Sequence, residues 1–397
     1  MEEVIQLFNS FKSVPKSIWL LAIAHGVVDM SPGAFYAALP FLKIKFSLSY
    51  AELGSIVLMQ SITSSISQPF FGYLCDRKAR VWFMPVGCLI LGISMLGTLL
   101  SPIYSLVFLS VACNGIGSAI FHPQAAKTVN LLSGSAKGKS LSLFSVGGNV
   151  GIVAGSLFLA SLLIHGEGPL LLIYPVPYLL ISGALFYFLH KVPRLETTAC
   201  TSFRRLKASV NWSLLALMGT VLTRATVSSG ISTFVPLYYM TYLHGSELYA
   251  SFLLTVHLGA GAVGTVIGGA LSDRWGSKQI MLYSILPIAA ALSLFKILDG
   301  PWIFAVLAIA SILLAATATS SLVFIQKMMP NNLGMASGLN LGFSSGLGAL
   351  GILAMGRVAD VWGMPLAFDL LATLPVIGFI MTLFVQEPVE KRVELEV

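Results

Sequence analysis

Long apolar stretches alternate with short polar segments along almost the whole chain. Each stretch is near or above the roughly 20 residues that a helix needs to cross a bilayer. The pattern therefore predicts an all-α membrane protein of twelve transmembrane helices, at 17–42, 49–75, 79–100, 102–131, 138–165, 167–191, 209–243, 247–273, 278–298, 301–328, 333–359 and 363–386. We expect no cleavable signal peptide, because the first stretch is too long and leads directly into the others.

Composition supports a membrane protein. Of the 397 residues, 56% are hydrophobic and only 10% are charged, whereas a soluble domain carries about 25% charged residues. The chain must therefore use the lipid bilayer as its solvent over most of its area. The net charge of +7 has no soluble basic domain to carry it, so we expect no nucleic-acid partner.

The basic residues predict the orientation. With the N-terminus inside, most Lys and Arg residues fall on the inner side, and only Lys43, Lys45, Lys296 and Arg357 fall on the outer side. Cytoplasmic loops carry such an excess of positive charge. We therefore expect a multi-pass protein of the cell (inner or plasma) membrane with both termini in the cytoplasm.

The second half of the chain repeats features of the first at an offset of about 196 residues. Gly72-Tyr-Leu-Cys-Asp76-Arg77 corresponds to Gly269-Ala-Leu-Ser-Asp273-Arg274, and Pro40 corresponds to Pro236. The repeat predicts two six-helix halves, 1–191 and 209–397, joined by a basic cytoplasmic linker at 192–208. Parallel repeats of this kind are typical of transporters whose substrate site lies between the halves.

One acidic residue lies far from both ends of its stretch. Asp29 is in the middle of the first stretch, and we expect it to be the only carboxylate deep in the bilayer. An ionisable group there costs about 2.5–3.5 kcal/mol on insertion scales, which indicates a function. Burial favours the protonated carboxylate, so Asp29 is a candidate proton carrier near neutral pH. His25 lies on the same helix face and can share the proton. The alternative is that Asp29 caps a helix break near Pro32 and Gly33.

Arg224 is the basic counterpart in the seventh stretch. It lies almost at the repeat-related position of Asp29. Its planar guanidinium suits a carboxylate or phosphonate, so it is a candidate substrate ligand. The alternative is a static Asp29–Arg224 salt bridge, and an intermediate hypothesis is that substrate and proton compete.

Other polar residues within the stretches are further candidates. His122, just before Pro123, is either a proton or substrate ligand or a polar group that satisfies a kinked backbone. The remaining substrate-binding candidates are Gln60, Gln124, Asn149 and His257. A lone histidine such as His257 can equally be a satisfied interhelical partner.

Two further patterns concern conformational change. The repeated loop motif forms a candidate latch that joins the halves at the cytoplasmic side. The alternative is that its charges serve only as a topology signal. The residues are Gly72, Asp76, Arg77, Arg80, Gly269, Asp273, Arg274 and Lys278. Glycines spaced for close helix packing follow one face of the fifth and eleventh stretches; they are Gly147, Gly151, Gly155, Gly338, Gly342 and Gly346. They predict either sliding surfaces between the halves or plain tight packing.

Several of these motifs resemble a known family. Gly72-x-x-x-Asp76-Arg77-x-x-Arg80 and its second copy resemble the loop signature of the major facilitator superfamily, except that Ala79 replaces the usual glycine. A narrower likeness is to the fosmidomycin-resistance branch, whose members are drug-efflux proton antiporters. The residues that carry it are Ala24-His25, Asp29, Gly54, Ser67-Gln68-Pro69, Gly72-Tyr73, Gly117-Ser118-Ala119, Phe121-His122-Pro123, Val146-Gly147-Gly148-Asn149 and Gly151.

One departure bears on proton coupling. Gln124 stands where that branch often has Glu, which removes a candidate proton carrier. Lys127 stands where a basic residue is expected.

The sequence predicts a proton-coupled efflux antiporter for a small anionic or amphipathic compound such as a fosmidomycin-like drug, acting by alternating access. The alternative is a symporter or uniporter that imports an anionic metabolite or siderophore-like compound. An enzyme is disfavoured because no HExxH, GxSxG or ATP-binding motif occurs. We expect no cofactor and no metal, since the four cysteines lack a CxxC spacing. We also expect a monomer whose partners are substrate, protons and lipid.

Overall fold

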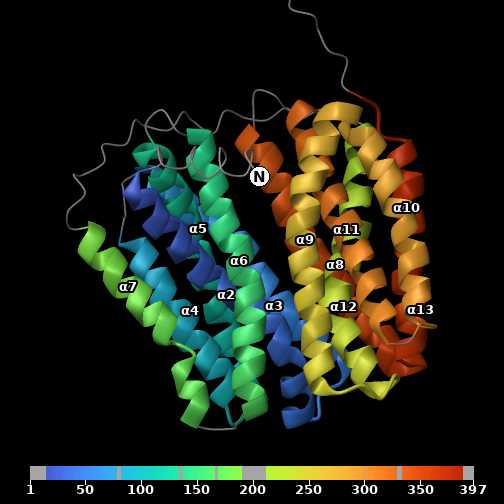
Figure 1. The fold of residues 1–397 in the computed structure, drawn as a ribbon, viewed down its shortest axis with the longest axis horizontal. Coiled ribbons are helices and arrows are strands. Elements are labelled where there is room, and N and C mark those ends of the chain that lie inside the picture. Colours follow the sequence, from blue (N-terminus) through green and yellow to red (C-terminus); the bar gives the residue numbers. More distant parts are fainter. Residues whose placement is uncertain are drawn as a thin grey trace, which may run out of the picture. The chain divides into compact units, whose positions relative to one another are not determined.

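The computed structural model describes residues 15–77, 82–133, 137–165, 169–189, 212–298, 300–328 and 333–387. Within these residues the chain forms α-helices and one 3-10 helix and contains no strand (Figure 1). The predicted all-α fold is confirmed. The predicted linker at 192–208 lies outside the described residues.

In the part of the chain that the structure describes, twelve α-helices follow one another in the order of the predicted stretches. They are α2 (Lys16–Phe46), α3 (Tyr50–Arg77), α4 (Phe83–Leu100), α5 (Tyr104–Leu132), α6 (Lys137–His165), α7 (Val176–Leu189), α8 (Trp212–Thr241), α9 (Glu247–Trp275), α10 (Ser277–Phe295), α11 (Pro301–Met328), α12 (Leu333–Trp362) and α13 (Met364–Leu383). Most of their ends agree with the predicted ones to within a few residues, because polar loop residues bound each apolar run.

The sixth predicted stretch departs most from a single helix. It begins with the 3-10 helix η2 (Pro169–Ile173), and the α-helix α7 starts only at Val176. Pro175 and Pro177 flank that start. Proline lacks an amide hydrogen and disfavours the helical conformation of the residue before it, so the helix begins at these prolines rather than before them.

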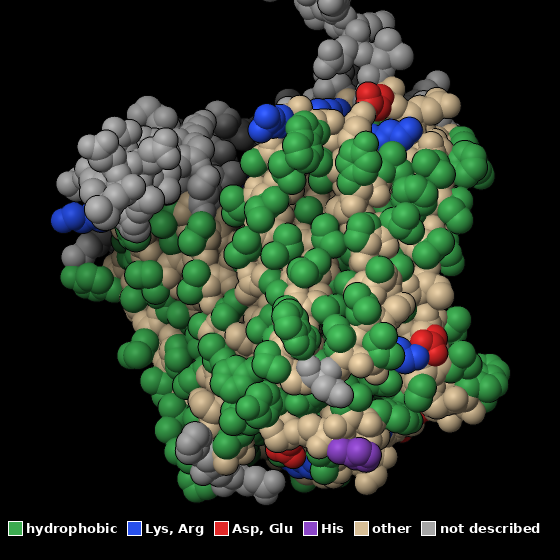
Figure 2. Space-filling view, turned by 45° about the vertical axis from the view of Figure 1, so that its right-hand side comes forward, with side chains coloured by type: hydrophobic (Ala, Val, Ile, Leu, Met, Phe, Trp, Pro, Cys, Tyr) green, Lys and Arg blue, Asp and Glu red, His purple; other side chains and the backbone are tan. Residues whose placement is uncertain are grey.

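Ten helical stretches among the described residues are long and apolar enough to cross a membrane. The helices α3 and α12 are not among them; in α3, serines and two glutamines lower the hydropathy. Hydrophobic side chains are spread over the face seen in Figure 2. Such a surface is suited to lipid.

The chain divides into two compact units. The first comprises 1–205, 231–259 and 352–364, and the second comprises 206–230, 260–351 and 365–397. In the first unit, α2 packs against α6 and α5, and α4 packs against α5 and α7. In the second unit, α10 packs against α11, and Leu217, Met281 and Ile325 are fully buried in a common cluster.

The glycines of α6 bring this helix close to α2. A Cβ atom at Gly147, Gly151 or Gly155 would lie 2.2, 1.9 or 2.0 Å from a backbone oxygen of α2. These three glycines therefore serve packing inside the first unit. On α12, a Cβ at Gly346 would meet open space, and the surroundings of Gly338 and Gly342 lie outside the described part.

Candidate functional site

Two histidines converge on Asp29. His25 Nε2 lies 3.2 Å from Asp29 Oδ2, and His122 Nε2 lies 3.1 Å from Asp29 Oδ1. The exposed fractions of the three side chains are 12% for His25, 13% for Asp29 and 28% for His122. The structure thus joins all three predicted proton-coupling residues in one group, which we call the His–Asp cluster.

Two helices position the cluster. His25 and Asp29 lie one turn apart on α2, as their spacing predicted, and His122 comes from α5. The helix α2 continues through Pro32, and the polar contacts of the Asp29 carboxylate within the described residues are with the two imidazoles. Asp29 therefore does not cap a helix break.

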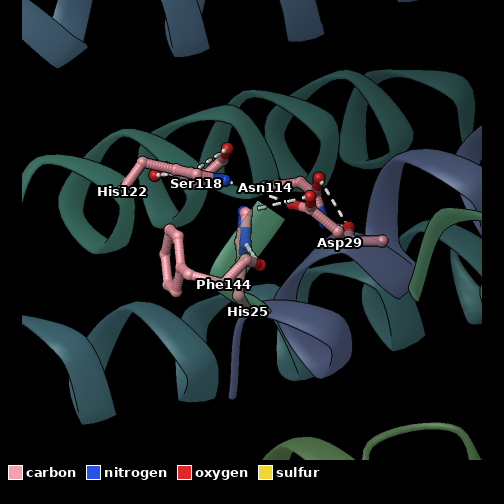
Figure 3. A network of polar contacts seen from close by, with 7 residues as sticks. His25, Asp29, Asn114, Ser118, His122 and Phe144 are labelled. Carbon is pink, nitrogen blue, oxygen red and sulfur yellow. Dashed lines mark hydrogen bonds and ion pairs between the residues drawn. The ribbon is translucent and has the colours of Figure 1, made fainter. Parts of the chain in front are cut away.

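Backbone carbonyls fix both imidazole rings. His25 Nδ1 lies 2.7 Å from the carbonyl oxygen of Phe144, and His122 Nδ1 lies 2.8 Å from that of Ser118 (Figure 3). Ser118 Oγ is also 3.2 Å from His122 Nδ1. Because Pro123 frees the carbonyl of Ala119 rather than that of Ser118, His122 does not compensate for the proline. Its other ring nitrogen is directed at Asp29.

The helix α6 closes one side of the cluster. The ring of Phe144 stacks on that of His25 with centroids 3.9 Å apart and planes 10° from parallel. A Cβ atom at Gly148 would lie 2.5 Å from both Asp29 Oδ2 and His25 Cε1. Only a glycine at this position leaves the cluster its observed arrangement.

A second polar group ties the helices together near Asp29. Asn114 on α5 donates from Nδ2 to Ser31 Oγ on α2 at 2.8 Å and to Ser94 Oγ on α4 at 3.2 Å. All three side chains are buried. Hydrogen bonds between buried polar groups define the register of α2, α4 and α5 beside the cluster.

The cluster is also the one set of three His, Cys, Asp or Glu side chains in the described residues whose ligand atoms lie within 4.8 Å of one another. A shared cation, either a proton or a metal ion, requires this kind of convergence. Imidazole nitrogens and carboxylate oxygens are suited to holding either cation.

Arg224 lies on α8 in the second unit and is 8% exposed. Its Nη2 donates to Ser344 Oγ at 2.6 Å, and its Nε has no hydrogen-bond partner among the described residues. Ser344 in turn is 3.5 Å from Asn340 Oδ1, and Asn340 Nδ2 donates to Ser321 Oγ at 3.2 Å. Within its unit this buried cation thus has neutral polar neighbours and no acidic partner among the described residues.

The other predicted substrate ligands have separate surroundings. Gln124 is buried; its Nε2 donates to Thr128 Oγ1 at 3.1 Å, and its Oε1 has no partner in the described part of the chain. His257 is buried on α9 and has an interaction partner. Gln60 and Asn149 are half-buried on α3 and α6. None of these four residues contacts the carboxylate of Asp29.

The predicted latch is described only in part. Arg274 lies 6.0 Å from the ring centroid of Trp275, and Lys278 Nζ donates to the carbonyl of Leu383 at 3.4 Å. A Cβ atom at Gly72 or Gly269 would meet only a side-chain carbon, at 3.8 and 3.7 Å. Arg80 and the side chains of Asp76, Arg77 and Asp273 lie outside the described residues. The latch therefore stays a prediction.

A cavity of about 550 Å³ occurs elsewhere in the first unit. Its walls include Pro40 and Phe41 of α2, Leu163 of α6 and Pro236 of α8. No residue of the His–Asp cluster or of the predicted substrate set lines it.

Sequence reasoning missed several supports of the site. Ser118 precedes His122 by one turn, a spacing that could have indicated the contact. The Phe144 carbonyl, Asn114 and Ser344 come from distant segments, and no sequence pattern reveals those contacts. Gly148 belongs to the Val-Gly-Gly-Asn motif, but its spacing did not indicate that it faces Asp29.

The sequence matches the family model described as Major Facilitator Superfamily over residues 21–223 and 216–397. It is 29% identical over 377 residues to the "Fosmidomycin resistance protein" of Escherichia coli (strain K12), covering 92% of each protein. It is also 29% identical over 383 residues to the "Uncharacterized MFS-type transporter YfnC" of Bacillus subtilis (strain 168), covering 91% of this chain and 90% of that protein.

Solved structures share the fold. An inward-facing, occupied bacterial homolog of the human lysosomal transporter Spinster aligns with a TM-score of 0.77 at 16% identity, over 93% of this chain and 96% of that chain. A point mutant of the nucleoside transporter NupG aligns with a TM-score of 0.76 at 14% identity, over 93% of this chain and 100% of that chain.

Proposed function

Because this chain belongs to the major facilitator superfamily, it is a membrane transporter and not an enzyme, and we propose that it is a proton-coupled antiporter. In this proposal the protein exports a small anionic or amphipathic compound in exchange for protons. The observation that carries the proposal is the convergence of His25 and His122 on Asp29.

The cluster has the properties that a proton carrier needs. Burial favours the neutral form of Asp29, whereas two adjacent imidazoles favour the ionised form, so the balance shifts with small changes in solvation. Histidine changes its charge in the physiological pH range. A conformational change that alters access to the cluster would therefore move protons between the two sides of the membrane.

Arg224 supports an anionic substrate. A buried charge without a counterion is costly, and the described residues of the second unit supply no acid to pair with its guanidinium. A carboxylate or phosphonate would supply the missing charge and accept hydrogen bonds from the guanidinium. The name of the fosmidomycin-resistance relative supports a drug of this kind as the substrate.

Proton-coupled flux in proteoliposomes tests this function. Purified protein is reconstituted with a pH-sensitive dye inside the vesicles, and fosmidomycin is added outside or preloaded. We expect fosmidomycin-dependent proton movement in the opposite direction to the drug, and loss of that movement in Asp29→Asn. The matched control is Asp369→Asn. This change neutralises a carboxylate that pairs with Lys296 and does not belong to the His–Asp cluster.

The possible results separate the candidate functions. Drug and protons moving in the same direction would indicate a symporter, and drug flux without proton flux would indicate a uniporter. Unchanged proton coupling in Asp29→Asn would disprove the proposal that the His–Asp cluster is the proton-coupling site.

A further inference from the structure

The hydrogen bonds of the His–Asp cluster allow its protons to be counted. A carbonyl oxygen can only accept, so the contacts to the Phe144 and Ser118 carbonyls require a hydrogen on Nδ1 of both His25 and His122. The Ser118 hydroxyl can rotate to suit this arrangement. In both rings, Nδ1 therefore donates a hydrogen bond to a backbone carbonyl oxygen.

The remaining ring nitrogens both face one carboxylate. A neutral imidazole with a hydrogen on Nδ1 presents a lone pair at Nε2, and an ionised carboxylate presents only lone pairs. The contacts at 3.2 and 3.1 Å involve different carboxylate oxygens. Each contact therefore needs a hydrogen of its own, and one proton can satisfy only one of them.

We propose that the His–Asp cluster binds two exchangeable protons, one between Asp29 and each histidine, and that coupled transport moves two protons per substrate. The inference rests on the proposed function for its transport step, but the count of protons at the site stands on the geometry alone. With both protons bound, the cluster carries a charge of +1. Loss of the first leaves it neutral, and loss of the second leaves it at −1.

The two protons of the cluster are released in two coupled steps. The two contacts share one carboxylate, so removing either proton changes the affinity for the other, and the two steps belong to the cluster rather than to single residues. The ring centroids of His25 and His122 are only 5.3 Å apart. Two imidazolium rings this close are stable together only while Asp29 is ionised between them.

Among the described residues, few other titratable groups reach the cluster. On α6, Phe144 and Gly148 contribute no charge. On α7, Tyr178 interacts electrostatically with Asp29, and its hydroxyl is hydrogen-bonded to that of Tyr174 at 2.8 Å. On α4, Ser94 is neutral, and on α5, Lys127 lies more than one turn beyond His122 and has a partner of its own. Within the part of the chain that the structure describes, the two histidines and Asp29 therefore account for the charge change at the site.

Imidazole nitrogen NMR tests the count without any substrate. The full-length protein is labelled with 15N-histidine in nanodiscs, and the signals are assigned with His25→Gln and His122→Gln. We expect two imidazolium rings together at acid pH and two neutral rings with hydrogen on Nδ1 at alkaline pH. His244 lies in an exposed loop and provides a comparison signal outside the cluster. Neutral rings with hydrogen on Nε2, or a single charged ring at every pH, would overturn the proposal.

The transport step is tested by the membrane potential at which flux stops. In proteoliposomes with fosmidomycin and a fixed pH gradient, the zero-flux potential gives the ratio of protons to substrate. We expect two in the wild type and one in His122→Gln, where the amide still donates to Asp29. A ratio of one in the wild type would refute two-proton coupling and leave the antiporter intact. If fosmidomycin moves no protons at all, the antiporter proposal fails, and the NMR count still decides the site.

Discussion

Gly148 determines whether the His–Asp cluster can assemble. Its missing side chain leaves the space that Asp29 Oδ2 and His25 Cε1 approach, and both of these atoms are at side-chain ends. A methyl group there would displace the two side chains and not the backbone. We therefore regard Gly148 as a positioning residue for the proton site.

We expect Gly148→Ala to fold but to lose roughly 10- to 100-fold in proton-coupled flux, because a displacement of about 1 Å at a reacting group has effects of that size. Proton flux in proteoliposomes measures the loss, and the melting midpoint reports folding. Gly183→Ala is the matched control, since a Cβ atom at Gly183 meets nothing within 4 Å. Equal flux in the two variants would contradict the positioning role.

Arg224 makes a prediction about ligand binding. An anion that pairs with this buried guanidinium stabilises the folded protein by mass action, by about 2.7 kcal/mol at 100 times its Kd. We expect saturating fosmidomycin to raise the heat-unfolding midpoint of the wild type but not that of Arg224→Gln. Arg274→Gln removes an exposed guanidinium instead and should keep the shift. A shift that persists in Arg224→Gln would mean that the anion binds elsewhere.

Part of this site could be predicted from sequence. The helical period placed His25 and Asp29 together, and hydropathy singled out Asp29. His122 lies 93 residues beyond Asp29 along the chain. Its contact with Asp29 follows from the packing of α2 against α5, which no local sequence pattern specifies. The role of Arg224 as an anion ligand stays a prediction, and the sequence did not predict its contact with Ser344 across 120 residues.

At the scale of elements, the contact between α2 and α6 holds the cluster in position. It depends on backbone approach at Gly147, Gly151 and Gly155, where van der Waals packing of small residues drives association inside a membrane. The glycine spacing predicted close packing of α6 but did not identify α2 as its partner. The spacing of the glycines shows which face of the helix packs closely. Which helix packs against that face depends on how the whole chain folds.

Gly151→Ala tests this contact. The added Cβ would lie 1.9 Å from the carbonyl oxygen of Gly26, so the backbones must separate and the overpacking should cost about 1–3 kcal/mol. We expect a lower melting midpoint than that of Gly183→Ala, which adds the same methyl group in open space. Equal midpoints would show that α2 and α6 tolerate separation.

At the scale of the whole molecule, the order of the described helices could be predicted from the apolar stretches and the polar segments between them. The internal repeat predicted the transporter class. The sequence did not indicate which polar contacts join helices that are distant along the chain. The latch was predicted from the charged residues of the repeated loop motif. A different contact is present in the first unit, where Asp360 accepts hydrogen bonds from the backbone amides of Tyr50 and Ala51 at 2.7 and 2.9 Å.

This contact joins the last turn of α12 to the first turn of α3, segments 309 and 310 residues apart. A carboxylate at a helix N-terminus contributes about 0.3–1 kcal/mol. In an alternating-access cycle, contacts at one end of the bundle break as those at the other end form. Asp360→Ala should therefore favour the conformation in which this end is open, by up to about fivefold.

Cysteine accessibility measures that shift. Leu48, just before α3, is 5% exposed, so Leu48→Cys in a background without the native cysteines should react slowly with a maleimide. We expect Asp360→Ala to accelerate the labelling and Asp369→Ala to leave it unchanged. Saturating fosmidomycin should alter the rate in the Asp360→Ala background as well, because a substrate that binds the two conformations unequally shifts their populations. Labelling that is insensitive to Asp360→Ala would mean that the contact caps α3 without contributing to the conformational balance.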